Sequence, residues 1–100
     1  MKLSDAARVL RSKNAGPLAL TIDILFQDRD GYDLAADSSA LTRAAISNLY
    51  GLPEDQVELT HVPMALAIKV TMPRPIVAGT PGDRDVYGAQ QHRPLLDIEL

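Results

Sequence analysis

The segment LALTIDILF, residues 18–26, decides the fold that the sequence predicts. Large apolar residues occupy every second position of this segment: Leu18, Leu20, Ile22, Ile24 and Phe26. The positions between them include the polar residues Thr21 and Asp23. Successive side chains of a β-strand point to opposite faces, so the pattern predicts a strand with one buried face and one polar face.

Three further segments alternate in the same way. Residues 57–61 and 65–72 lie on either side of the turn Val62-Pro63, which predicts two antiparallel strands. At the C-terminus, LLDIEL (residues 95–100) separates Leu96, Ile98 and Leu100 from Asp97 and Glu99. This last segment predicts a fourth strand.

Helices are predicted between and before these strands. Ser4 and Asp5 are residue types that cap helices, and the apolar residues that follow them predict a helix up to Lys13. After the turn QDRDG at residues 27–31, a brief helical segment is expected around residues 32–35. A further helix, capped by Ser38 or Ser39, should contain Leu41, Ala44, Ala45 and Leu49 and end at Gly51.

The sequence therefore predicts an α+β fold in a single domain spanning residues 1–100. Four strands form an antiparallel sheet with helices on one face, a ferredoxin-like variant in which a long loop precedes the last strand. In this arrangement the strands that contain Asp23 and Lys69 are central and adjacent.

The other face of the sheet is expected to be polar and uncovered. It would carry eight side chains: Thr21, Asp23, Glu58, Thr60, Lys69, Thr71, Asp97 and Glu99. Such a face invites a partner. The alternative is a solvated face with an ordinary Asp23–Lys69 cross-strand pair, which is worth about 0.2 to 1 kcal/mol.

Composition and charge exclude several classes of protein. The formal charge of −3 and the four aromatic residues provide neither a basic stripe nor a stacking platform for nucleic acid. There is no cysteine, so disulfides, thiolate metal sites and a cysteine nucleophile are excluded. A membrane-spanning helix needs about 20 consecutive apolar residues, and no segment approaches this length. The apolar core of a signal peptide is also not found near the N-terminus. We expect a cytoplasmic protein.

The long loop is PRPIVAGTPGDRDVYGAQQHRP, residues 73–94. Irregular segments of this length in small domains are usually functional or disordered. His92, Asp85 and Tyr87 are the candidate catalytic residues, because each could transfer a proton. Arg74, Gln90 and Gln91 are candidate substrate-binding residues, suited to a carboxylate or carbonyl group. The alternative is a lid that satisfies its own backbone.

Arg11, Lys13 and Asn14 complete the candidate substrate-binding set, as a cationic corner that could hold an anion. The alternative is that they cap a helix C-terminus. Asp83, Asp85 and His92 do not have the spacing of a metal motif, so no metal site is predicted. The sequence identifies no cofactor, and the serines lie in helix or cap contexts without a nucleophile elbow.

Two classes of function remain. The favoured one is an accessory or small subunit, which docks its polar sheet face or its loop on a larger catalytic protein. The other is a self-sufficient lyase or isomerase acting on a carboxylate, built as a homo-oligomer with active sites at subunit boundaries.

A family resemblance favours the first class. The segments ARVLRSKNAGPLALTIDILF, LYGLPEDQV, ALAIKVTMPRP and GTPGDRDVYGAQQHRPLLDIEL resemble the whole length of a bacterial family catalogued as domain of unknown function 4387, chiefly through RSKNAGP and DVYGAQQH. That family occurs beside, or fused to, large proteins similar to AtuA, the acyclic terpene utilisation protein, whose C-terminal part is described as ferredoxin-like. The resemblance implies a small companion of an AtuA-like large subunit in carboxylic acid or acyl-CoA metabolism. It supplies no catalytic residues.

Overall fold

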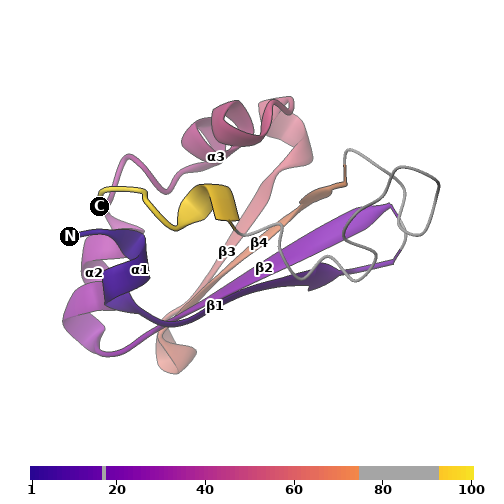
Figure 1. Ribbon diagram of the computed structural model, residues 1–100. Helices are drawn as coiled ribbons and strands as arrows, with labels where there is room; N and C mark the ends of the chain where they lie inside the picture. The colour runs from indigo at the N-terminus through magenta and orange to yellow at the C-terminus, as the bar shows by residue number, and fades with distance from the viewer. Residues whose placement is uncertain (17, 75–92) are drawn as a thin grey trace.

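Four antiparallel strands form one sheet in the order β1-β2-β4-β3 (Figure 1). Their bounds are β1 Ala7–Asn14, β2 Ala19–Phe26, β3 Glu58–Val62 and β4 Ala67–Pro73. The computed structural model describes residues 1–16, 18–74 and 93–100. The predicted α+β class, with a four-stranded antiparallel sheet and helices, is confirmed.

The two central strands are those whose alternation is clearest in the sequence. Ile22 of β2 pairs with Val70 of β4, and both side chains are fully buried. The next pair in register is Asp23 with Lys69, so the predicted adjacency of these residues is confirmed. The Asp23–Lys69 ion pair of the alternative interpretation is not present among the described residues, where Asp23 pairs with Arg11 of β1.

The predicted N-terminal helix is wrong over most of its length. Only one helical turn, α1 (Leu3–Ala6), forms, and the chain then continues directly into β1. Arg8 is an extra residue that bulges from β1, since Ala7 pairs with Phe26 while Val9 pairs with Leu25. Pairing with β2 along the whole strand provides hydrogen bonds that outweigh the local helical preference of the segment.

The predicted C-terminal strand is not part of the sheet. Residues 93–95 form a 3-10 turn, η3 (Arg93–Leu95), and Glu99 then makes an isolated antiparallel bridge with Lys2. Two ion pairs accompany this bridge: the N-terminal amino group lies 3.3 Å from Glu99, and Lys2 lies 3.7 Å from Asp97. Asp97 and Glu99 therefore do not lie on the sheet face to which they were assigned, and the edge beside β2 is occupied by β1.

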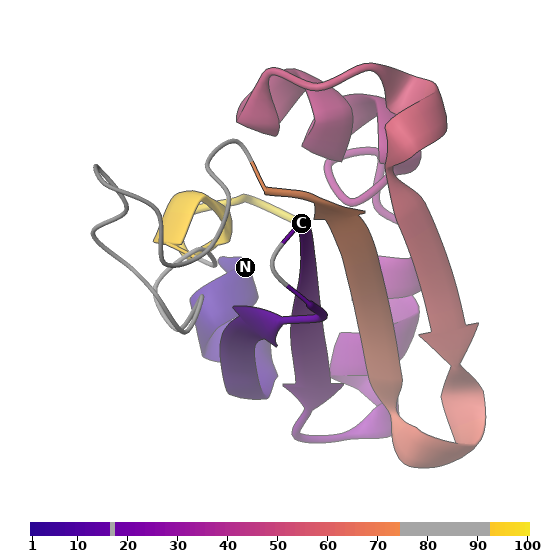
Figure 2. The ribbon, with the colours of Figure 1, turned by 90° about the vertical axis from the view of Figure 1, so that its right-hand side faces the viewer.

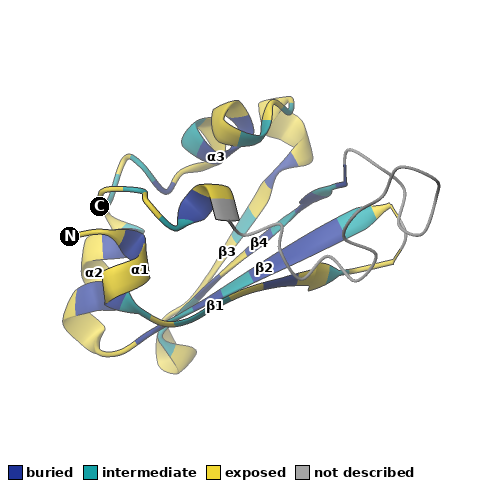
Figure 3. Ribbon diagram, viewed as in Figure 1, coloured by how far each residue is buried: buried dark blue, intermediate teal, exposed yellow. Residues whose placement is uncertain are grey.

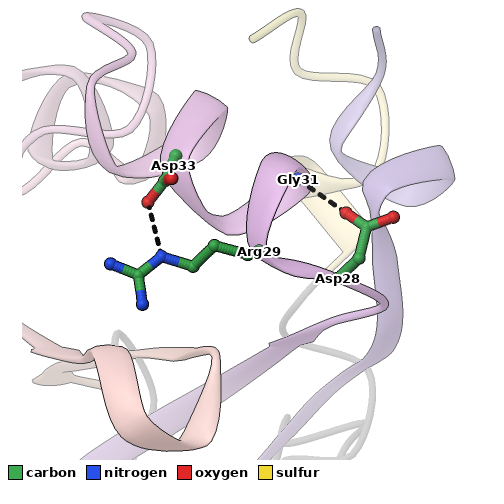
Figure 4. Close-up of polar contacts among 4 residues, drawn as sticks. All are labelled: Asp28, Arg29, Gly31 and Asp33. Carbon is green, nitrogen blue, oxygen red and sulfur yellow. Dashed lines mark hydrogen bonds and ion pairs between the residues drawn. The ribbon is translucent and has the colours of Figure 1, made fainter.

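The helices α2 (Arg29–Ala36) and α3 (Arg43–Tyr50) connect β2 to β3. Asp28 caps α2, accepting a hydrogen bond of 2.8 Å from the amide of Gly31, and Arg29 bonds to Asp33 one turn later (Figure 4). The cap of α3 is Thr42, which accepts from the amide of Ala45, and not Ser38 or Ser39 as predicted.

One apolar core lies between the sheet and the segments on its covered face (Figures 1 and 3). Side chains from the helices, the chain termini and the turns reach the sheet there: Leu3, Ala6, Tyr32, Ala35, Leu41, Ile46, Val57 and Leu95. The strands contribute Leu20, Ile22, Ile24, Phe26, Ile68, Val70 and Met72. The core is mainly aliphatic, as the scarcity of aromatic residues in the sequence requires.

Truncation at the centre of this core should destabilise the fold strongly. Ile68→Ala should lower the free energy of unfolding by about 2–5 kcal/mol, because the fully buried side chain leaves a cavity. Leu34→Ala on α2 is the control, since Leu34 is 42% exposed and should change stability by no more than about 0.5 kcal/mol. Chemical denaturation measures both, and equal effects of the two changes would contradict the assigned core.

Alkaline pH should weaken the fold through Tyr50. Burial raises the pKa of the Tyr50 phenol above its ordinary value of 10.0. Above that pH the unfolded chain releases the phenolic proton while the folded chain retains it, so stability is lost as pH rises. Denaturation between about pH 9 and pH 11 should show a smaller loss for Tyr50→Phe than for the unmodified chain. The same pH dependence in both proteins would contradict this role of Tyr50.

Candidate functional site

A nearly buried arginine marks the end of the sheet at which β4 stops. Arg74 follows β4 directly and is 9% exposed. Its backbone amide donates to the carbonyl of Leu18 (3.0 Å), which continues the pairing of β4 with the chain that enters β2. Its Nη1 donates to the side-chain oxygen of Asn14 at 2.8 Å. The chain that enters β2 thus holds the backbone of Arg74, and Asn14 of β1 holds its guanidinium.

Strand alternation explains why these two side chains meet. Asn14 is in register with Leu20, and Leu20 is in register with Met72, two residues before Arg74. All four residues consequently belong to the helix-covered side of the sheet. The sequence analysis proposed both Asn14 and Arg74 as substrate-binding residues, and the structure brings these two together across 60 residues of chain.

The contact with Asn14 orients the guanidinium of Arg74. An amide oxygen is an uncharged acceptor, so this hydrogen bond holds the guanidinium without adding a negative charge beside it. A guanidinium presents several N–H donors in one plane, which suits paired hydrogen bonds to a carboxylate or a phosphate. Near-complete burial strengthens such an interaction, because little water competes for it.

Arg11 and Lys13 do not join this pair. They lie on β1 at positions that alternate with Asn14, so their side chains project from the opposite face of the sheet. Arg11 lies opposite Asp23, with 3.6 Å between Nε and Oδ2. The predicted corner of three residues is thus divided between two faces, and the alternative of a helix C-cap is also wrong because these residues form a strand.

The remaining candidate residues lie outside the described part of the chain. Asp85, Tyr87 and His92 were proposed as catalytic, and Gln90 and Gln91 as substrate-binding; their roles stay predictions. Within residues 1–16, 18–74 and 93–100, no group of three His, Cys, Asp or Glu side chains is arranged to hold a metal ion. No helix in the same ranges is long and apolar enough to cross a membrane.

Two cavities in the described part of the chain have acidic linings. One of about 360 Å³ lies at the start of α2, and its lining includes Asp5, Asp28 and Asp30. A second, of about 310 Å³, is lined in part by Asp55 and Glu58. Carboxylates repel other anions, so neither cavity suits an anionic substrate. The guanidinium of Arg43 beside the second cavity is engaged by the backbone carbonyl oxygens of Val57 and Glu54.

The uncovered face of the sheet carries the expected polar residues of the strands. Thr21, Asp23, Lys69 and Thr71 of the central strands share it with Glu58 and Thr60 of β3. The sequence analysis missed the contribution of β1, which adds Val9, Arg11 and Lys13. These three residues alternate with Leu10, Ser12 and Asn14, a pattern that could have indicated a strand. Each of the two sets mixes apolar and polar residues, however, so neither one stands out as the buried face.

Loss of the Asn14 side chain should destabilise the protein by removing this acceptor from a buried cation. Asn14→Ala should lower the free energy of unfolding by about 1.5–3 kcal/mol, the range for hydrogen bonds to charged groups. Asn14→Asp should retain most of the stability, because it supplies an acceptor and a compensating charge. Arg8→Ala, at the exposed bulge of the same strand, serves as the control. Equal stability of Asn14→Ala and Arg8→Ala in chemical denaturation would contradict the assignment.

Comparison with known proteins matches the chain to a family model. No curated protein and no solved structure matches the chain. A family model described as Domain of unknown function (DUF4387) matches residues 3–99, which includes every strand and helix described above and both members of the Asn14–Arg74 pair. The chain therefore belongs to this family.

Proposed function

We propose that the chain is a small accessory subunit of a larger enzyme that acts on a carboxylic acid or an acyl-CoA ester, and that the larger subunit is an AtuA-like protein. The observation that carries the proposal is the oriented, nearly buried guanidinium of Arg74. The chain segment that follows Arg74 contains Gln90, Gln91 and His92, the amide and imidazole groups expected to orient a substrate.

The chemistry of Arg74 supports an anionic substrate. Carboxylic acids are ionised at neutral pH, and coenzyme A esters carry phosphate groups, so both substrate classes present the oxygen pairs that a guanidinium binds. Charge-assisted hydrogen bonds of this kind are worth about 1.5–3 kcal/mol each. We therefore assign Arg74 to substrate binding and Asn14 to positioning Arg74.

The surroundings of this pair support a subunit rather than a complete enzyme. The two cavities described above are acidic, and the Asn14–Arg74 contact provides a cation and an amide. A second polypeptide would supply the remaining groups. In this arrangement His92, Asp85 and Tyr87 would complete a shared site as proton-transfer groups.

Coexpression with an AtuA-like protein tests the proposal. The two chains should co-purify, and the complex should convert a carboxylate or acyl-CoA substrate that neither chain converts separately. Steady turnover by the isolated small chain would support the self-sufficient lyase or isomerase instead. Failure of the two chains to associate would contradict the accessory role.

Substitution at the Arg74 pair should then affect binding of the substrate. Arg74→Gln should raise the substrate KM of the complex about 10- to 150-fold, the equivalent of one lost charge-assisted hydrogen bond. Asn14→Asp should act in the same direction while preserving stability, because its carboxylate competes with the substrate for Arg74. Arg29→Gln, on the exposed surface of α2, is the matched control and should leave KM unchanged. Unchanged KM in Arg74→Gln, with assembly intact, would contradict the assigned role.

A further inference from the structure

Three rows of side chains cross the uncovered face of the sheet, one residue from each strand in the order β1, β2, β4, β3. The apolar row is Val9, Leu25, Ala67 and Val62. The charged row is Arg11, Asp23, Lys69 and Thr60. The third row is Lys13, Thr21, Thr71 and Glu58. Neighbouring residues of a row are cross-strand partners, so each row is fixed by the register of the sheet.

Helices α1, α2 and α3 do not cover this face, and most of its residues are exposed or half-buried; Thr21, in the middle of the third row, is only 3% exposed. Helices α1, α2 and α3 all lie on the other side of the sheet, as the views in Figures 1 and 2 agree. Val62 is 39% exposed, and Met64, in the turn that joins β3 to β4 next to the apolar row, is completely exposed. Val9, Leu25 and Ala67 of the apolar row are half-buried. Together with Val62 and Met64 they form a contiguous apolar strip, a feature that marks interaction surfaces when it is large enough.

We propose that this face binds a second copy of the chain, and that the two copies are related by a two-fold axis that runs parallel to the strands between β2 and β4. Rotation about this axis places β1 over the partner's β3 and β2 over the partner's β4. The position along the strands is unchanged by the rotation, so each row lies against the same row of the other copy. Two sheets packed face to face in this way lie about 10 Å apart, within reach of interdigitating side chains.

The charges of the face are complementary under this rotation. Asp23 lies opposite the partner's Lys69, and the same pair is repeated by symmetry. Lys13 lies opposite the partner's Glu58, so the third row contributes two further pairs of opposite charge. Within the described residues Lys69, Lys13 and Glu58 have no ion-pair partner in their own chain, which leaves their charges available to a facing copy. Asp23 is already 3.6 Å from Arg11, so the partner's Lys69 would be a second cation beside its carboxylate.

The apolar row is also matched with itself. Leu25 lies opposite the partner's Ala67, a large residue against a small one, and Val9 lies opposite the partner's Val62. Side chains of the two inner faces interdigitate when aligned sheets pack together. Burial of this row would remove apolar surface from water, which is the main favourable contribution to most protein associations.

Electrostatics distinguish this axis from the other face-to-face arrangement. A two-fold axis perpendicular to the strands, passing through the charged row, would set Asp23 against the partner's Asp23 and Lys69 against the partner's Lys69. It would also set the apolar row against the third row, which carries Lys13 and Glu58. Like charges set against each other across an interface oppose association. The charge pattern therefore selects the axis parallel to the strands.

The size of the face suits a reversible dimer. Four strands about 4.8 Å apart and three rows about 6.8 Å apart give a flat footprint of about 400 Å² per copy. With the turn around Met64 included, association would bury on the order of 1,000 Å² in total, the lower end for specific interfaces. We expect dissociation in the micromolar range.

The dimer does not depend on the proposed function. Asn14 and Arg74 belong to the helix-covered side of the sheet, so a second copy on the uncovered face leaves their contact unchanged. In this arrangement a second copy occupies the polar face that was expected to dock on a larger protein. Dimerisation is measured on the purified chain and the accessory role on the complex, so each can fail separately.

A mixing experiment with reversed charges tests the proposal. Sedimentation equilibrium should show the unmodified chain as a dimer at about 100 µM that dissociates on dilution. Asp23→Lys and Lys69→Asp should each dimerise more than about tenfold more weakly, because each places like charges opposite one another twice. An equimolar mixture of the two variants should form a heterodimer. In that heterodimer the lysine introduced at position 23 of one chain faces the aspartate introduced at position 69 of the other. The unchanged Lys69 of the first chain faces the unchanged Asp23 of the second, so both contacts join opposite charges.

Mixing separates pairing between chains from pairing within one chain. Within each variant chain, positions 23 and 69 are neighbours that carry the same charge. Opposite charges can therefore meet only between two different chains. Asp33→Lys and Lys2→Asp change the charge of residues away from this face by the same amounts and should dimerise like the unmodified chain, separately and mixed. If either main variant does not fold, as judged by circular dichroism, Lys13→Glu and Glu58→Lys replace them, with the same expected rescue on mixing.

Three results would overturn the proposal. An unmodified chain that stays monomeric at about 100 µM would show that the face binds another partner or only water. Variants that dimerise as strongly as the unmodified chain would place the interface elsewhere. Weakened variants that are folded and yet show no heterodimer on mixing would exclude the arrangement in which Asp23 faces the partner's Lys69.

Discussion

The pairing of β2 with β4 is the constraint on which the rest of the structure depends. Because Ile22 is in register with Val70, the apolar residues of both strands face the same core. The same register places Asp23 beside Lys69 on the other face. A shift of one residue would move the whole apolar set of one strand to the uncovered side, so the register sets the core and the polar face together.

Sequence alternation was sufficient to predict these central strands and insufficient to predict the edge. In β2 and β4 every core position is apolar, whereas the core side of β1 holds Leu10, Ser12 and Asn14. The bulge at Arg8 further interrupts the period. An edge strand pairs with only one neighbouring strand, so its alternation of apolar and polar residues is less strict. Local signals then favoured a helix, and only the pairing with β2 identifies a strand.

The C-terminal segment and the candidate site show a second limit, which concerns partners distant in sequence. LLDIEL alternates and does pair in an antiparallel sense, but with the chain around Lys2 and not with the sheet. Alternation predicts that one side of a segment is buried, but it does not predict which segment that side packs or pairs with. Arg74 and Asn14 were identified by residue type, and their contact required a strand where a helix was predicted. Arg11 and Lys13 were grouped with Asn14 for the same reason, although they lie on the other face of the sheet.

Strand alternation places the proposed substrate-binding pair and the proposed dimer interface on opposite faces of the sheet. Asn14 and Arg74 close the covered side of the sheet at one end, while the three rows occupy the other side. The edges of the sheet favour association through the face. Arg8 bulges from one edge, and the other edge is a strand of five residues followed directly by a proline. Pairing of the β1 edge of one copy with the β3 edge of the next would extend from chain to chain, whereas a two-fold face contact closes after two copies. A charge pattern that is self-complementary about one axis favours that closed form.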